Sequence, residues 1–344
     1  MLKIVKWIAL TLVLISLLLS ILYWDLVVYG IRQGKGQLSI VWNAKPVEDF
    51  LKDPAFPDSL KAKLRLIEEV RKFAIDSLGL KDTKNYKTLY DQKGEEIMWV
   101  VTASEPFQLI AKEWVFPVLG AVPYKGFFNR NLALAEKQML ESEGWDVSVR
   151  NPGGWSTLGW FSDPILSGML QRSDGDLASL IIHELVHSSI FVKDSVDLNE
   201  NLASFIGDRG AEKFLMTRFG KSSTEYTEYL QEEKDFDGYV DHILRGCNYL
   251  DSLYYGIAEL PIEEKLKRKE VAIQMIMTTS DTLSLIILPT PAQNRVDKLP
   301  NNAYFMSFRR YQSRQDDFWD EWQNDFSGNL RSYIADKAKR YPFL

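Results

Sequence analysis

The chain has 344 residues, of which 46% are hydrophobic and 12% aromatic, a composition typical of a globular protein with a substantial core. The formal net charge of −6 argues against nucleic acid as the main partner, because phosphate binding requires a basic face. The single cysteine, Cys247, excludes an intramolecular disulfide bond.

The N-terminus combines a basic flank with an apolar segment. Residues 1–6 contain Lys3 and Lys6, and residues 7–24 hold no charged side chain. A helix of that length reaches about 27 Å, close to the thickness of the hydrocarbon core of a bilayer. We therefore expect residues 7–24 to be a transmembrane signal-anchor, with the flank cytoplasmic and the remaining chain periplasmic or at the cell surface. A signal peptide cleaved after Gly30 is the alternative.

The segment after the apolar stretch, residues 25–58, is interpreted as a linker with a flexible exit at Gly30, Gly34 and Gly36. Residues 59–344 then form one domain, in which most apolar residues recur at helical spacing. We expect helices over 59–78, 128–143, 173–191, 197–219, 224–250, 261–277 and 304–339, and strands over 97–102, 114–118 and 146–149. This pattern predicts an α+β fold that is mainly helical and contains a small sheet.

The segment Leu180-Ile-Ile-His-Glu-Leu-Val-His187 contains the pattern H-E-x-x-H. Residues four apart share one face of a helix, so His183 and His187 can bind one zinc ion while Glu184 reaches a water on the metal. Glu184 would take a proton from that water as general base and later protonate the leaving amine. The sequence thus predicts metal-assisted hydrolysis with one zinc ion per chain. An exposed Glu184 in a surface ion pair is the non-catalytic alternative.

A catalytic zinc site usually needs a third protein ligand, and Glu200 is the candidate. It lies thirteen residues after His187, in the first turn of the next expected helix. Asp194 and Asp197 are the alternative oxygen ligands. His242 is expected to be structural, because it stands alone on a distant helix.

A tetrahedral oxyanion also needs a hydrogen-bond donor opposite the metal, typically Tyr or His. The chain contains 15 tyrosines, too many for the sequence to select one. Tyr124 and Tyr311 are the first candidates for this role.

The arrangement His183-Glu-x-x-His187 with Asn199-Glu200-x-x-Ala203 resembles the gluzincin metallopeptidases, and more closely the bacterial putative aminopeptidase family. Further matching blocks are Tyr29-x-x-x-Gln33 with Gly36-Gln37, Arg71 to Gly79, Trp114 to Pro117, Tyr124-Lys-Gly126, Ser156 to Pro164, and Pro300 to Ala303 with Tyr311. This resemblance implies a zincin-like metallopeptidase domain with its small sheet beside the motif helix. It also implies zinc ligands at His183, His187 and Glu200, with Glu184 as the base.

The same resemblance implies that residues 156–161 form a strand lining the substrate cleft, with the following substrate-binding residues: Ser156, Thr157, Leu158 and Gly159. Two features depart from the related families. The spacer between the second histidine and Glu200 is shorter than is typical of gluzincins, and Trp155 stands where the closer family commonly has tyrosine.

The expected function is that of a membrane-anchored zinc aminopeptidase that trims short peptides outside the cytoplasm. Such an enzyme needs an acidic group to pair with the α-ammonium of the peptide, because a buried unpaired cation is costly. Asp163 is the candidate, and a turn residue before Pro164 is its alternative interpretation. There are two alternatives: an endopeptidase or oligopeptidase on the same scaffold, and a catalytically silent envelope binding protein.

Overall fold

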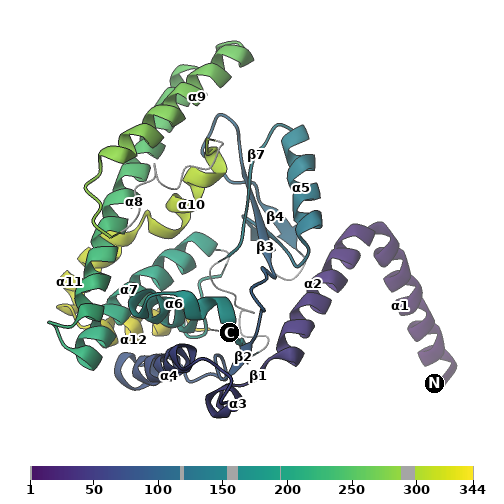
Figure 1. Ribbon diagram of the computed structural model, residues 1–344. Helices are drawn as coiled ribbons and strands as arrows, with labels where there is room; N and C mark the ends of the chain where they lie inside the picture. Colours follow the sequence, from purple (N-terminus) through teal and green to yellow (C-terminus); the bar gives the residue numbers. More distant parts are fainter. Residues whose placement is uncertain (1, 117–119, 153–161, 194, 288–298, 344) are drawn as a thin grey trace.

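The computed structural model describes residues 2–116, 120–152, 162–193, 195–287 and 299–343 (Figure 1). Its architecture is mainly helical with small sheets, which confirms the α+β, mainly helical part of the predicted fold class. The N-terminal helix stands away from the body of the molecule, at the right of the view (Figure 1).

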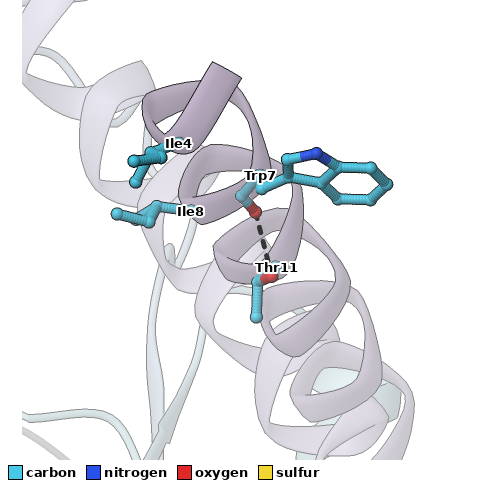
Figure 2. Close-up of a pocket in the computed structure, with 4 residues that line it drawn as sticks. All are labelled: Ile4, Trp7, Ile8 and Thr11. Carbon is cyan, nitrogen blue, oxygen red and sulfur yellow. Dashed lines mark hydrogen bonds between the residues drawn. The ribbon is translucent and has the colours of Figure 1, made fainter. Parts of the chain in front are cut away.

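Two helices, α1 (Leu2–Leu22) and α2 (Trp24–Asn43), open the chain as a hairpin. Large apolar side chains of α1 face solvent, including Trp7 at 69% exposure. Figure 2 shows Ile4, Trp7, Ile8 and Thr11 around a shallow apolar hollow on this helix, where the Thr11 hydroxyl donates to the Trp7 carbonyl at 2.9 Å. The sequence predicts that residues 7–24 span a membrane. In the described part of the chain, no helix combines the length and apolarity that crossing a membrane demands.

The predicted linker is largely helical. Residues 25–58 form most of α2 and all of α3 (Val47–Lys52), and the three glycines of the expected flexible exit lie inside α2. The side chains of Tyr29 and Gln33, one turn apart, both donate to the Gly126 carbonyl at 3.0 Å. A Cβ atom at Gly36 would come within 2.2 Å of the Phe128 ring, so only glycine permits this packing. These contacts dock α2 against the domain.

The first of three sheets has the strand order β6-β3-β7. Strand β3 (Trp99–Ser104) pairs antiparallel with β6 (Lys125–Phe127) and with β7 (Asp146–Arg150), and helix α5 (Arg130–Ser142) covers it through Ala133 and Leu140. The predicted strands at 97–102 and 146–149 and the predicted helix at 128–143 correspond to these elements within one to two residues.

The other sheets are smaller. Strand β2 (Thr88–Tyr90) pairs antiparallel with β1 (Lys45–Pro46) and parallel with β8 (Ile165–Leu166). Strand β4 (Trp114–Phe116) pairs antiparallel with β5 (Gly120–Val122). Residues of β2 and β8 belong to the same hydrophobic core as the helix that carries the H-E-x-x-H motif.

The main core is built around three helices: α4 (Asp58–Phe73), which continues through a π-helical turn to Leu78, α6 (Asp174–His187), and α7 (Val196–Phe219). Helix α6 ends at His187, four residues before the predicted end at 191. The chain leaves the helix there because it pairs with the C-terminal segment: the Phe191 amide donates to the Tyr341 carbonyl at 3.0 Å.

The C-terminal part is also helical. Helix α8 (Thr224–Gly256) is longer than predicted, and α9 (Ile262–Thr279) follows it. The predicted single helix at 304–339 is divided into α10 (Asn302–Gln312), α11 (Gln315–Phe326) and α12 (Leu330–Arg340). Residues of α8, α9 and α10 share a second hydrophobic core, whereas residues of α11 and α12 belong to the main core. Ser327 and Gly328 adopt left-handed backbone angles, φ 50° and 71°, which end α11.

Candidate metal centre

Helix α6 carries both histidines of the motif and is anchored on its remaining faces. The Ser173 hydroxyl accepts the Asp176 amide at 3.2 Å and so caps the N-terminus of this helix. Four large apolar side chains of this helix are fully buried in the main core: Leu177, Ile181, Ile182 and Leu185. This packing fixes the rotation of α6 and leaves the histidine face against α7.

The imidazoles of His183 and His187 and the carboxylate of Glu200 converge on one point. The two Nε2 atoms are 3.1 Å apart, and the Glu200 Oε2 atom is 3.4 Å from the first and 3.7 Å from the second. A tetrahedral zinc ion with bonds of about 2.0–2.1 Å has ligand atoms about 3.4 Å apart. The three donors therefore have both the chemistry and the separations that one zinc ion requires, and this group can hold a metal ion.

Helices α6 and α7 run antiparallel and approach closely beside this point. The Ser179 hydroxyl on α6 donates to the Asp208 carboxylate on α7 at 2.6 Å, and His183 lies opposite Gly207. A Cβ atom at Gly207 would stand 3.0 Å from the Ser179 carbonyl and 3.2 Å from the His183 Cβ atom. A small residue is needed here for Glu200, two turns earlier on α7, to reach the histidines.

The connection between the two helices is held by the residue that precedes Glu200. The Asn199 side chain accepts the Val192 amide at 2.7 Å and donates to the Val192 carbonyl at 2.8 Å. On the other side of the site, the Ser204 hydroxyl lies 3.5 Å from the His183 Nδ1 atom, the ring nitrogen that faces away from the cluster. Contacts of this kind orient ligands and are part of a metal site.

Burial and mutual charge set the protonation of the cluster. Burial raises the pKa of Glu200, but the nearby His187 and His183 rings outweigh it and hold that pKa well below its ordinary value. Burial lowers the pKa of His187, but the Glu200 carboxylate outweighs burial and raises it. An ionised carboxylate beside two imidazoles is the form in which these groups bind a divalent cation.

Glu184 lies beside the cluster and is only 8% exposed. Burial raises its pKa above the ordinary value, the two histidines oppose this shift, and Glu200 adds to it. The side chain is therefore not the exposed surface residue of the non-catalytic alternative. A buried carboxylate with a raised pKa is suited to accept and return a proton.

Both tyrosines singled out from the sequence lie near this centre. Burial raises the pKa of Tyr124, and the carboxylate of Glu200 raises it further. The pKa of Tyr311 is raised in the same way, first by burial and then by Glu200, while Arg150 opposes the shift. Both phenols thus remain protonated at neutral pH and can donate hydrogen bonds.

Two arginines near these tyrosines were not found by sequence reasoning. Arg150, the last residue of β7, directs its Nη2 atom towards the Tyr311 hydroxyl at 3.5 Å. Arg310 is buried on α10 and donates to the Asp197 carboxylate at 3.2 Å. A cation at the end of a predicted strand, just before Pro152-Gly153-Gly154, is the one sequence feature that could have drawn attention to Arg150.

Several other predicted residues occupy different positions. Asp163 is 1% exposed and its carboxylate accepts the Asn85 side-chain amide at 3.4 Å, while its carbonyl accepts the Tyr86 amide at 2.7 Å. These contacts hold the Asp163 carboxylate in the interior beside Asn85, and its pairing with an α-ammonium group stays a prediction. The predicted strand at 156–161, with Ser156, Thr157, Leu158 and Gly159, lies outside the described residues, as do the following two positions: Trp155 and Asp194.

The two remaining metal-ligand alternatives can be located. Asp197 pairs with Arg310, as above, and within the described ranges it does not belong to the metal-binding group. His242 lies on α8, where its Nε2 atom bonds to the Ile276 carbonyl at 2.8 Å. The position of His242 agrees with the structural role expected for it.

Two imidazoles and a carboxylate on facing helices, with a second buried carboxylate beside them, define a site able to hold a divalent metal next to a proton-transfer group. Residues 28–340 match the family model described as "Putative aminopeptidase", and the chain belongs to this family. The family description indicates peptidase activity, which is a hydrolysis. No curated protein and no solved structure matches the chain.

Proposed function

We propose that the chain is a zinc-dependent aminopeptidase that acts on short peptides, with α6 and α7 arranged as in a zincin. The observation that carries this proposal is the convergence of His183, His187 and Glu200 at separations of 3.1, 3.4 and 3.7 Å, which fit one tetrahedral zinc ion. Membership of the aminopeptidase family supports the peptidase part of the proposal.

Different residues of the chain bind the metal and transfer the proton. His183, His187 and Glu200 hold the ion, and the lowered pKa of Glu200 keeps its carboxylate ionised as a ligand. When bound, zinc polarises a carbonyl group and lowers the pKa of a water towards 7. Glu184 takes a proton from the attacking water and delivers it to the leaving amine, and its raised pKa suits both transfers.

The developing oxyanion needs donors that are already oriented. Tyr124 and Tyr311 are protonated, largely buried and close to Glu200, so their hydroxyl groups are the proposed donors. Tyr311 is further oriented by Arg150, whose guanidinium lies 5.9 Å from the ring centroid. Their task is to bind the oxygen of the cleaved amide more tightly in the transition state than in the ground state.

A zinc endopeptidase is the second candidate, and the contacts of Asp163 favour it. The carboxylate proposed to pair with the peptide α-ammonium is almost fully buried and bonded to Asn85. An aminopeptidase should cleave a free peptide far faster than its N-acetylated twin. Equal rates for the two peptides, together with cleavage of internally quenched peptides, would assign an endopeptidase.

Metal content and peptide hydrolysis, measured on the same preparations, test the proposal. We expect one zinc per chain and hydrolysis of a fluorogenic peptide panel in the wild type and in His242→Ala, the matched histidine outside the cluster. His187→Ala should lose both. Equal trace metal in all three proteins would refute the zinc site, and tightly bound zinc without hydrolysis of any peptide would favour the catalytically silent binding protein.

A further inference from the structure

Among the residues that the structure describes, no carboxylate pairs with the guanidinium of Arg150. Its Nε atom is buried and makes no hydrogen bond. Its single hydrogen bond within the described ranges is the 3.5 Å contact from Nη2 to the Tyr311 hydroxyl, a neutral and distant acceptor. No carboxylate of those ranges lies within 4.0 Å of it.

Arg150 is half-buried, with its Nε atom in the interior, and the buried cations of the described ranges named next are all paired. Arg310 contacts Asp197 at 3.2 Å, Lys269 contacts Asp146 at 2.5 Å, and Lys337 contacts Glu321 at 2.6 Å. Burying a charge costs several kcal/mol unless a partner compensates it. Arg150 therefore differs from its counterparts elsewhere in the fold, and an anion from outside the chain would supply the missing partner.

The position of Arg150 is fixed by the backbone and lies within reach of the site. As the last residue of β7 it pairs with Val100 of β3, so its side chain starts from an ordered sheet. The guanidinium touches the Tyr311 phenol, and the Glu200 carboxylate in turn acts on the pKa of that phenol. Arg150 thus contacts the phenol whose pKa responds to the Glu200 carboxylate.

We propose that Arg150 binds a carboxylate of the peptide substrate. A guanidinium presents a planar fork of N–H donors that matches a carboxylate, and the Nε–H group, which has no hydrogen-bond partner in the described ranges, can supply one arm of that fork. This inference rests on the proposed peptidase function and names its substrate class: peptides with a carboxylate close to the cleaved bond. That carboxylate is either the C-terminus of a di- or tripeptide or an acidic side chain.

Three peptides distinguish these sources: Leu-Gly-Gly, its C-terminal amide, and Leu-Glu-Gly-amide. A charge-assisted, two-point contact should lower KM about 10-fold to 100-fold for a peptide that offers the carboxylate, relative to the uncharged amide. A lower KM for Leu-Gly-Gly identifies the C-terminus, and a lower KM for Leu-Glu-Gly-amide identifies the side chain. In Arg150→Gln the KM ratio between the charged and the uncharged peptides should fall to about 1, whereas any loss of rate common to all three peptides reports the altered orientation of Tyr311.

Two matched variants control for charge and geometry. Arg150→Lys keeps the charge without the fork and should retain only part of the preference. Arg268→Gln removes the same charge from the exposed surface of α9 and should keep the full preference. Calorimetry measures the equilibrium binding of the three peptides to zinc-loaded Glu184→Gln. This measurement reports the same preference without turnover.

The possible failures are separable. Hydrolysis of the uncharged amide tests the proposed function, whereas the ratio between charged and uncharged peptides tests Arg150. A wild type that cleaves or binds all three peptides alike overturns the inference, and so does an Arg150→Gln protein that keeps the preference. If no peptide is cleaved, the proposed function fails and the binding measurement alone decides the role of Arg150.

Discussion

Two hydrogen bonds join the side chain of Asn199 to the backbone of Val192: its Oδ1 atom accepts the Val192 amide at 2.7 Å, and its Nδ2 atom donates to the Val192 carbonyl at 2.8 Å. The side chain of Asn199 thus pairs with the chain as a neighbouring strand would. This pairing ties the first turn of α7, which begins at Val196, to the connection after α6, one residue before Glu200. The asparagine next to the proposed ligand therefore positions the ligand through the backbone.

Asn199→Ala should consequently weaken metal binding without removing a ligand. Both backbone groups of Val192 would lose their partner, so we expect a loss of about 1–3 kcal/mol in stability and about a 10-fold to 100-fold loss in zinc affinity. Asn131→Ala, on the exposed surface of α5, is the control and should change neither quantity. A chelator competition titration measures the zinc affinity. An unchanged zinc affinity in Asn199→Ala would show that Asn199 does not position Glu200.

Gly207 gives the second prediction, because α6 and α7 approach most closely there. Gly207→Ala would put a Cβ atom 3.0 Å from the Ser179 carbonyl and 3.2 Å from the His183 Cβ atom. The helices would separate slightly, so we expect about 1–3 kcal/mol lower stability and weaker zinc binding. Gly238→Ala on α8 meets nothing within 4 Å and should instead stabilise by about 0.5–1 kcal/mol through helix propensity. Urea denaturation compares the two, and equal effects would contradict the steric argument.

The sequence predicts helices well where their residues alone determine them. It fails where contacts with distant segments of the chain determine the end of a helix. Helix α6 follows from apolar periodicity, α7 begins one residue before its predicted start at 197, and the spacing of the two histidines is a local feature too. The end of α6 depends on pairing of Phe191 with Tyr341, which no window around the motif contains. The break of the last predicted helix depends on the left-handed angle at Ser327, a residue without the usual glycine signature.

The same distinction applies to the surroundings of the centre. Tyr124 and Tyr311 could be proposed only among 15 tyrosines, because their approach to Glu200 is a property of the tertiary fold. Arg150 was overlooked because a single arginine at a strand end has no pattern of its own. Its unpaired state becomes visible only when its neighbours are known.

Glu184 provides the third prediction, since it is assigned to proton transfer and not to metal binding. Glu184→Gln keeps the size and hydrogen-bonding capacity of the side chain but can neither accept nor return the proton. We expect zinc content to stay at one per chain and kcat to fall at least about 10²–10⁴-fold. Asp197→Asn, which alters a carboxylate outside the cluster, is the control for both measurements. Retained turnover in Glu184→Gln would exclude this residue as the base.

The fourth prediction concerns pH and a buried acidic pair, Glu233 on α8 and Asp208 on α7. Burial raises the pKa of Glu233, and the neighbouring Asp208 raises it further, against the opposing effect of Arg209. A carboxyl group whose pKa is higher in the folded state contributes its full stability below the unfolded pKa of 4.5 and loses it as pH rises through the folded pKa. Wild-type stability should therefore decline from pH 5 towards pH 9.

Glu233→Gln imitates the protonated side chain and should flatten this decline. At pH 8 we expect the variant to be more stable than wild type by about 1–2 kcal/mol, with little difference near pH 4.5. Glu228→Gln, one helical turn away on the exposed side of α8, should leave the pH profile unchanged. Denaturant midpoints across the pH range measure the effect, and a parallel shift at every pH would show that burial of Glu233 does not control it.

The fifth prediction addresses the apolar surface of α1, which we propose binds a membrane. Trp7 and Ile8 are 69% and 55% exposed around the hollow in Figure 2, and Lys3 and Lys6 stand at the same end of the helix. Burying two such side chains in lipid stabilises by about 2–3 kcal/mol each, so the full chain should sediment with vesicles and resist high salt. Trp7→Asp combined with Ile8→Asp should shift most of the protein to the supernatant. Trp42→Asp, at 78% exposure on α2, is the control and should still sediment. If the double variant sediments like the wild type, α1 is not the membrane-binding element.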